Sequence, residues 1–373
     1  MLENDKDRRM IKWQVILHQR RFQALVVTLM FGIIYYHKVS SSSYSKSSLK
    51  GSSSYEQVLP LEARGAVIGE TELFYMLPKK KTVGILVFFH GCNHAGQDMF
   101  RLPEDRIVAQ RALDRGLAVL SPTSINRKSG CWSKRDIETI QSERVFEQWL
   151  QKVNLGPELP RMGMGASSGG NILFMAHNAF SFRSIVSYIM ASGFSQFDWE
   201  RRSEINPLPS VGYVHMPKDS KRAEKIPALV AQLEEENIPT QTWEVLPHAL
   251  TSEVCQQRIP ELHGRCGAII RYIQDNYEDL LDKDGNVLEP YTSEKWESLF
   301  VKSKLDPDNF EKTKQRAEKA GKGSLIGVQF SGHSWLWAAL VEEIAVSYGK
   351  HEMTAEHAES VLDFLMKNAG IEI

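Results

Sequence analysis

The pattern of apolar and polar positions divides most of the chain, from about residue 59, into short strands and amphipathic helices. Apolar runs bounded by polar or glycine-containing turns predict a strand pair within 66–76 and single strands at 83–89, 117–122, 161–166, 185–190, 211–216 and 242–246. Segments with helical spacing of apolar residues lie between them, at 105–115, 136–153, 171–178 and 220–236. This alternation predicts an α/β fold with a mostly parallel central sheet and helices on both faces.

The alternation ends after Pro247. Residues 250–330 contain helical pieces and an Asp284-Gly285 turn but few candidate strands. Two further helical segments, 335–348 and 355–367, close the chain. We therefore expect a helical cap at about 250–330, inserted into one folded domain that covers 59–373.

The first 58 residues have a different composition. Residues 1–21 are rich in Lys and Arg, and 22–36 form an uncharged apolar run that Lys38 follows closely. The run predicts a transmembrane signal anchor at 22–37, with the basic N-terminus cytoplasmic and the folded domain lumenal or extracellular, as in a single-pass type II membrane protein. The alternative is cleavage of the N-terminal segment, which would give a secreted or organellar protein. Residues 38–58 predict a Ser-rich linker.

Composition narrows the class of protein. The chain has 45 Lys+Arg against 46 Asp+Glu, so it lacks the basic excess that drives nucleic-acid binding. Its four cysteines are too few for a disulfide scaffold and form no CxxC pair. The sequence around Asp282 fails as a calcium loop, because Val287 stands where the loop needs glycine. We expect no nucleic-acid partner, no metal and no cofactor, and oligomeric state is not indicated.

The sharpest local motif is Gly165-Ala166-Ser167-Ser168-Gly169-Gly170, which lies between a predicted strand and a predicted helix. A G-x-S-x-G at this position predicts a nucleophile elbow, a tight turn that exposes a reactive serine. The frame selects Ser167, and the neighbouring Ser168 is its competitor. A glycine-rich turn without catalytic function is the alternative.

A second motif, HGCNH at 90–94, directly follows the apolar strand at 83–89. Backbone N–H groups in such a loop can form an oxyanion hole over the serine. We expect the N–H of Cys92, or that of Asn93, to act together with the N–H of Ser168. His90 and Asn93 are expected to contact substrate, with structural packing of His90 as the alternative. A metal site is disfavoured, since no further His/Cys cluster completes it.

A catalytic acid and base should follow the serine along the chain. Asp219 comes after the predicted strand 211–216 and is the expected acid, although it could serve only as a helix N-cap. Asp198 is its substitute. His351 is the expected base, because it immediately precedes the final helix, while His333 and His248 are the alternatives.

Together, the segments HGCNHAGQD, GCWS, GASSGG, VHMPKD and AVSYGKHEMT resemble plant and algal α/β-hydrolase superfamily proteins, which are distantly similar to dienelactone-hydrolase-like and prolyl-oligopeptidase-like serine hydrolases. The resemblance runs from about Gly84 to Phe364. It implies the α/β-hydrolase fold with Ser167 as nucleophile and Asp219 as acid, and its closing His-Glu pair favours His351. The N-terminal anchor and Ser-rich linker depart from the family pattern. The resemblance implies no particular substrate.

The same resemblance draws attention to residues near the expected site. Cys92 and Cys131 lie on loops that could approach one another, as a disulfide or as two free thiols. Trp132 could wall an acyl pocket or be buried in the core. Asp98 could brace the oxyanion loop or merely begin a helix.

The motifs and the resemblance together predict a serine hydrolase that cleaves a carboxylic ester or related acyl bond of a small molecule. Two alternatives stay open. One is a serine peptidase of the prolyl-oligopeptidase type, and the other is a non-catalytic α/β-hydrolase-fold binding protein.

Overall fold

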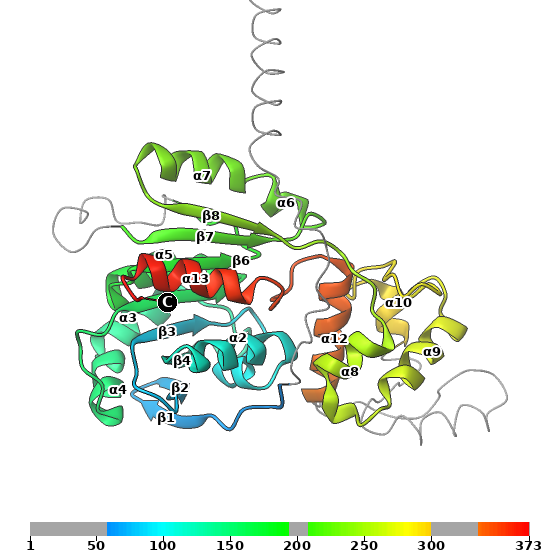
Figure 1. Ribbon diagram of the computed structural model, residues 1–373, viewed down its shortest axis with the longest axis horizontal. Coiled ribbons are helices and arrows are strands. Elements are labelled where there is room, and N and C mark those ends of the chain that lie inside the picture. The colour runs from blue at the N-terminus through cyan, green and yellow to red at the C-terminus, as the bar shows by residue number, and fades with distance from the viewer. Residues whose placement is uncertain (1–57, 194–207, 300–334, 373) are drawn as a thin grey trace, which may run out of the picture. The chain divides into compact units, whose positions relative to one another are not determined.

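The computed structural model describes residues 58–193, 208–299 and 335–372 (Figure 1). An 8-stranded sheet has the order β1-β2-β4-β3-β5-β6-β7-β8. The strands are β1 Arg64–Ile68, β2 Thr71–Met76, β3 Gly84–Phe89, β4 Leu117–Thr123, β5 Arg161–Ala166, β6 Ser184–Tyr188, β7 Ser210–His215 and β8 Thr240–Glu244. β2 runs antiparallel to both β1 and β4, and the pairs from β4 through β8 are parallel.

Helices cover both faces of this sheet because its central strands are apolar on both sides. In β3 the side chains of Ile85 and Val87 pack into one hydrophobic cluster, and Leu86 and Phe88 pack into the other. The second cluster includes residues of α2 Pro103–Asp114 and α13 Ala358–Asn368; the first includes residues of α3 Lys134–Ser142, α4 Val145–Val153, α5 Ser168–Phe180 and α7 Ile226–Glu235. The strand order and the two helical layers define the α/β-hydrolase fold, which confirms the predicted fold class.

One predicted helix is in fact two. The segment 136–153 breaks where Arg144 adopts a left-handed conformation with φ of 50°. Glu143, the residue before the break, accepts a hydrogen bond from the N–H of Glu70 in the β1–β2 turn. A capping box precedes α3, since Asp136 accepts hydrogen bonds from both the N–H and the hydroxyl of Ser133.

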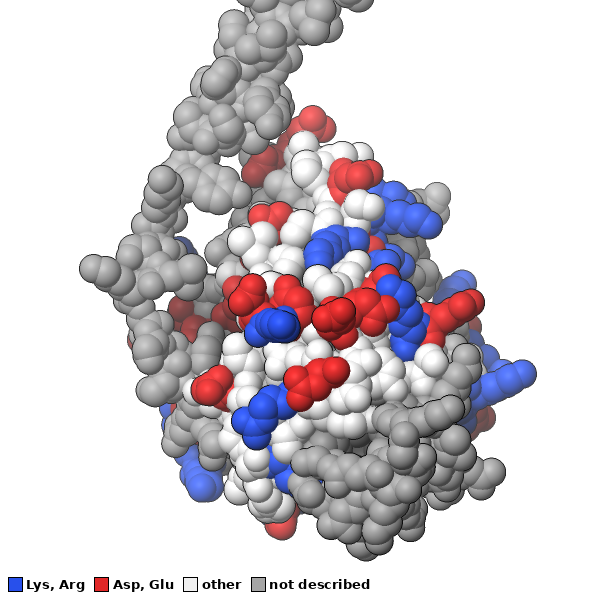
Figure 2. Space-filling model, turned by 90° about the vertical axis from the view of Figure 1, so that its right-hand side faces the viewer, with Lys and Arg blue, Asp and Glu red and all other residues white. Residues whose placement is uncertain are grey.

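A group of helices between β8 and α13 surrounds its own hydrophobic cluster (Figure 1). Its members are α8 Ser252–Arg258, η4 Pro260–Leu262, α9 Cys266–Asn276, α10 Glu294–Glu297 and α12 Trp335–Tyr348. A disulfide between Cys255 and Cys266 joins α8 to α9. Acidic and basic side chains lie next to one another on this side of the molecule (Figure 2), as where Lys295 pairs with Asp279 and Glu289. The cap boundaries of 250–330 stay a prediction, since 300–330 lies outside the described residues.

The expected membrane anchor requires correction. Within the described part of the chain, no helix combines the length and the apolar character that crossing a membrane demands. This finding contradicts both the transmembrane signal anchor at 22–37 and the type II membrane location. The apolar run 22–36 has fifteen residues, fewer than the roughly 17–25 that a spanning helix requires. The run itself, with 1–21 and nearly all of 38–58, lies outside the described residues.

Buried ion pairs connect α2 to the cap helices. The fully buried guanidinium of Arg106 donates to the carboxylate of Glu261, at 2.7 and 3.2 Å, and to the carbonyl of Arg258 at 2.7 Å. The Arg258 guanidinium in turn lies 3.0 Å from Glu104 on α2. Each charge that is removed from water here has a partner of opposite sign, which offsets its desolvation.

We expect Arg106→Met to lower the free energy of unfolding by roughly 3 kcal/mol, because it leaves the Glu261 carboxylate, whose side chain is only 14% exposed, without its partner. Urea unfolding of the full chain measures this change. The double variant Arg106→Met/Glu261→Leu should recover most of the loss, since it removes both charges. A single variant as stable as the parent protein would contradict this account of how the cap helices are held.

Candidate active site

Ser167 lies in the turn between β5 and α5 and has an unusual backbone conformation, with φ of 52° and ψ of −113°. Two glycines permit this turn. A Cβ on Gly169 would lie 1.9 Å from the carbonyl oxygen of Phe89, and a Cβ on Gly165 would lie 2.5 Å from the backbone of Gly169. The helix therefore approaches the ends of β3 and β5 more closely than any side chain allows, and Ser167 is held in a sparsely populated region.

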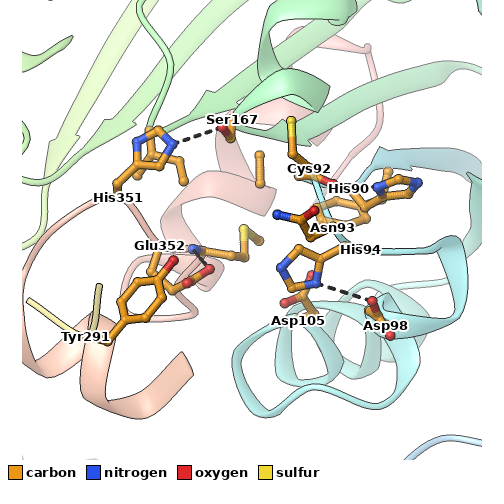
Figure 3. Close-up of a pocket in the computed structure, with 15 residues that line it drawn as sticks. His90, Cys92, Asn93, His94, Asp98, Asp105, Ser167, Tyr291, His351 and Glu352 are labelled. Carbon is orange, nitrogen blue, oxygen red and sulfur yellow. Dashed lines mark hydrogen bonds and ion pairs between the residues drawn. The ribbon is translucent and has the colours of Figure 1, made fainter. Parts of the chain in front are cut away.

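Ser167, His351 and Asp219 form one chain of hydrogen bonds. The Ser167 hydroxyl lies 2.9 Å from His351 Nε2 (Figure 3), and His351 Nδ1 lies 2.6 Å from Asp219 Oδ2. The three residues come from the end of β5, from the loop between α12 and α13, and from the loop after β7. These segments meet because the carboxyl ends of parallel strands share one edge of the sheet.

The surroundings of His351 keep its ring neutral. Burial lowers the pKa of the imidazole most, the hydrogen bond to Asp219 raises it, and the nearby charge of Arg222 lowers it again, so that the pKa lies below its ordinary value of 6.5. Asp219 is 5% exposed, and its second oxygen accepts from Arg222 at 2.9 Å. At neutral pH, Nδ1–H can therefore donate to Asp219 while Nε2 accepts the serine proton.

Of the alternative acid and bases, the structure describes His248. His248 hydrogen-bonds through its backbone N–H to the Ser347 carbonyl, and its ring Nδ1 lies 3.2 Å from the Ala249 carbonyl. His333 and Asp198 fall outside the described residues. Asp219 does occupy the N-cap position of the short helix α6 Ser220–Ala223, but its side chain makes no capping hydrogen bond there.

Of the backbone N–H groups expected at the oxyanion hole, one already donates a hydrogen bond to another residue and two do not donate to any described residue. Asn93 N–H donates to the Ser129 carbonyl at 2.7 Å, so it is already engaged. No described residue accepts a hydrogen bond from the N–H of Cys92 or of Ser168. Ser168 is the first residue of α5, where N–H groups have no partner within the helix. Cys92 and Ser168 thus remain the two candidate donors.

His90 and Trp132 support the loops of the site. His90 is 2% exposed and donates through Nδ1 to the Gly91 carbonyl, while its Nε2 accepts from Ser124 N–H at 3.1 Å. Burial lowers the pKa of His90 to about 4, so the ring is neutral. Trp132 packs against the rings of His90 and Phe89, outside the lining of the cavity beside Ser167. For both residues, contact with substrate stays a prediction.

A cavity of about 180 Å³ opens beside Ser167 and His351 (Figure 3). Its lining includes the expected Asn93 and Asp98, the latter expected either to brace the oxyanion loop or to begin a helix. It also includes four polar residues that sequence reasoning did not assign to the site, namely His94, Asp105, Tyr291 and Glu352. The sequence could have indicated two of these four residues, since His94 belongs to the HGCNH motif and Glu352 follows His351. Tyr291 comes from the cap segment, and its sequence context gives no sign of its position.

Side chains that could bind a metal ion do not cluster in the described part of the chain. Across 58–193, 208–299 and 335–372, no cluster of three or more His, Cys, Asp or Glu side chains has an arrangement that could hold a metal ion.

Comparison with known proteins adds little beyond this geometry. No protein-family model and no curated protein matches the sequence. Similar solved structures include a sugar hydrolase from Lactococcus lactis (15% identity, 49% of this chain and 82% of that chain, TM-score 0.36), a thermostable esterase (17%, 51% and 56%, 0.38) and a carboxyl esterase from Bacillus coagulans (9%, 51% and 91%, 0.37). These TM-scores and identities are too low to indicate the activity of this chain.

Proposed function

We propose that the protein is a serine hydrolase that cleaves a carboxylic ester or a related acyl bond of a small molecule. The observation that supports this proposal is the chain of hydrogen bonds from Ser167 through His351 to Asp219, with distances of 2.9 and 2.6 Å. A serine hydroxyl becomes a nucleophile when a neutral imidazole accepts its proton and a carboxylate stabilises the resulting imidazolium.

In the proposed reaction, Ser167 Oγ attacks the acyl carbon and His351 Nε2 takes the hydroxyl proton. The N–H groups of Cys92 and Ser168 donate to the carbonyl oxygen as it becomes an oxyanion. The imidazolium then protonates the leaving alcohol, and an acyl ester remains on Ser167. Water, deprotonated by His351, then attacks this ester. The resulting tetrahedral intermediate collapses and releases the carboxylic acid, and the His351 imidazolium returns its proton to Ser167 Oγ.

We expect a fluorophosphonate probe to label the full chain and Ser167→Ala to abolish the labelling. Ester turnover should fall by roughly 10⁴-fold or more in Ser167→Ala and in His351→Ala, since either change removes the activated nucleophile. Mass spectrometry of the labelled peptide and steady-state kinetics measure the two effects.

His248→Ala is the matched control, and it should retain both labelling and turnover. Labelling that persists in Ser167→Ala would disprove the assignment of the nucleophile. The absence of any labelling would favour the non-catalytic binding protein, and labelling with turnover of peptides but not of esters would favour the peptidase.

The pH dependence of turnover should follow His351. Because the ring must be neutral and its pKa lies below 6.5, kcat/KM should fall as the pH drops below that value and stay level from about pH 7.5 until His94, whose pKa is about 9, loses its proton. Asp219→Asn should move the acid-side inflection to lower pH, since Asp219 raises the pKa of His351, and should reduce kcat by roughly 10⁴-fold. An acid-side inflection above pH 7 in the parent enzyme would contradict this assignment of the base.

A further inference from the structure

A second His–Asp pair faces the same cavity from the opposite side. His94 Nδ1 lies 3.2 Å from Asp98 Oδ2, which also accepts from the N–H of Ala95 at 2.9 Å. This bond fixes the ring, so the other ring nitrogen is directed into the cavity, across from His351 (Figure 3). The His94 side chain is 35% exposed, and a bound molecule can therefore reach it.

Several titratable groups surround the His94 ring. Burial would lower the pKa of His94, but the hydrogen bond to Asp98 and the charges of Glu352 and Asp105 outweigh burial and raise it to about 9. His94 is therefore a cation at neutral pH, beside the Asp98 carboxylate. Burial raises the pKa of Glu352, and raises that of Asp105 to about 7. Hydrogen-bond donors and acceptors thus line the cavity, and the positive charge of His94 lies among the carboxyl groups of Asp98, Asp105 and Glu352.

These charged and polar side chains determine which chemical group of a substrate the cavity can bind. A carboxylate would face Asp98, Asp105 and Glu352, and an ammonium group would face His94. An alkyl chain would cover the imidazolium without giving it a hydrogen-bond partner, which is costly for a charged group. The cavity of about 180 Å³ also limits the size of this group. A small neutral group with hydroxyls meets all of these conditions.

Building on the proposed function, we infer that His94 determines specificity, and that its Nε2–H binds a substrate oxygen outside the scissile ester. The preferred substrates are then small hydroxylated esters rather than fatty acyl esters. Asp98 positions the ring of His94 for this contact.

Two matched pairs of esters test this inference: ethyl 3-hydroxybutyrate against ethyl butyrate, and glycerol 1-acetate against propyl acetate. For at least one pair, the full chain should have a kcat/KM about 10-fold higher for the hydroxylated member. His94→Leu should remove this preference, and His94→Gln, which keeps an N–H donor, should retain part of it. His248→Leu is the control and should leave the preference unchanged.

A preference that survives in His94→Leu, or a parent enzyme that favours the unhydroxylated member of both pairs, would overturn the inference. Melting temperatures of the variants show whether each one is folded under the assay conditions. If no ester is turned over and no fluorophosphonate labels Ser167, the proposed function itself fails, and that outcome is distinct from a loss of selectivity.

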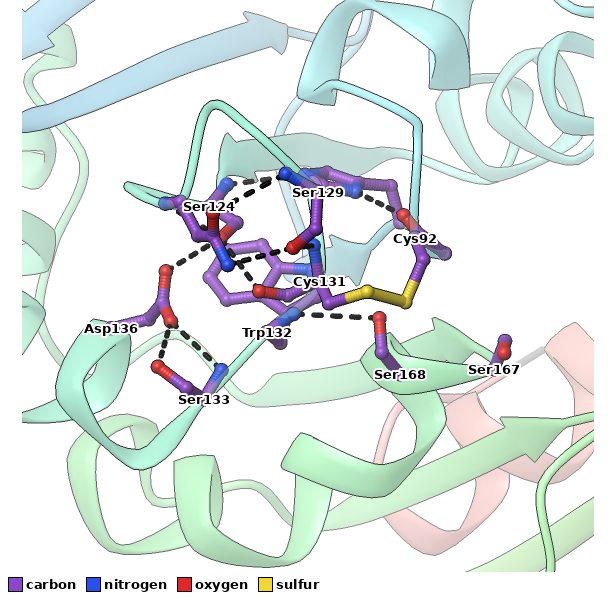
Figure 4. The surroundings of a disulfide bond; sticks show 12 residues. Cys92, Ser124, Ser129, Cys131, Trp132, Ser133, Asp136, Ser167 and Ser168 are labelled. Carbon is purple, nitrogen blue, oxygen red and sulfur yellow. Dashed lines mark hydrogen bonds between the residues drawn. A yellow bond between two sulfur atoms is a disulfide. The ribbon is translucent and has the colours of Figure 1, made fainter.

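The disulfide between Cys92 and Cys131 supports a second, independent inference (Figure 4). It joins the loop after β3 to the loop before α3, across 39 residues of sequence. The second loop contacts both sides of the proposed oxyanion hole. Its Ser129 carbonyl accepts from Asn93 N–H, the neighbour of Cys92, and its Trp132 N–H lies 3.4 Å from the Ser168 hydroxyl.

The loop that carries Cys131 is itself held firmly. The Ser124 hydroxyl contacts the Cys131 carbonyl at 3.1 Å and Asp136 Oδ1 at 2.8 Å. The same carboxylate accepts from the N–H of Ile125 and of Ser133, which ties the loop to the start of α3. A rigid support of this kind can fix the position of Cys92 through one covalent bond.

Again building on the proposed function, we propose that Cys131 is a positioning residue. Through the disulfide, it holds the Cys92 N–H where the oxyanion forms. Without the bond, the serine, the base and the acid stay in place, but one donor loses its fixed position. Preorganised donors act on the transition state more than on the bound substrate, so the loss should appear in kcat rather than in KM.

We expect Cys92→Ala/Cys131→Ala to lower kcat about 10-fold, with KM changed less than about twofold. The matched control is Cys255→Ala/Cys266→Ala, which removes the disulfide of the cap and should keep kcat. Dithiothreitol, which forms its own cyclic disulfide as it converts the protein disulfide to two thiols, should lower kcat of the parent enzyme reversibly. It should have no further effect on the first variant.

An unchanged kcat in Cys92→Ala/Cys131→Ala, or an equal loss in the control variant, would overturn this role of the disulfide. Assays are made below the melting temperature of every variant, so that unfolding does not enter the comparison. Fluorophosphonate labelling of Ser167 in the parent protein establishes separately that the proposed function holds.

Discussion

The close approach of α5 to the ends of β3 and β5 is the constraint on which the site depends. Gly169 has space for no Cβ against the Phe89 carbonyl, and Gly165 has none against Gly169. With the helix held this near, Ser167 must turn through a φ of 52°, which lifts its side chain above the edge of the sheet. The same approach brings the N-terminus of α5, with its unpaired N–H groups and partial positive charge, beside the serine hydroxyl.

The remaining parts of the site meet this serine because the parallel strands end at one edge. Cys92 and His94 lie in the loop after β3, Asp219 lies in the loop after β7, and His351 lies between α12 and α13. His351 has a φ of 51°, and Gly349 just before it has a φ of 79° with no space for a side chain against Pro247. The two residues joined by the 2.9 Å hydrogen bond, Ser167 and His351, therefore both have a positive φ, which is costly for a residue with a side chain.

Much of this arrangement could be predicted from sequence, because it depends on local patterns. The apolar runs fixed the strands, and the glycines around Ser167 marked the turn. The position of Asp219 followed from the rule that parallel strands end together. What could not be predicted depends on distant contacts: the break at Arg144, the arrival of Tyr291 from the cap, and the Cys255–Cys266 disulfide. The expected membrane anchor was wrong, since a fifteen-residue apolar run is too short to define a span by itself.

The buried carboxyl groups connect the packing of α12 on α2 to the chemistry of the cavity. Glu104 and Asp105 on α2 face Glu342 and Glu343 on α12, and burial raises the pKa of the latter two well above the ordinary value. This shift favours the protonated forms of Glu342 and Glu343, and protonation lessens the repulsion among the four carboxyl groups where the two helices meet. Asp105 also lines the cavity, and its charge contributes to the raised pKa of His94. The contact between α2 and α12 thus influences the charge of the imidazole ring opposite His351.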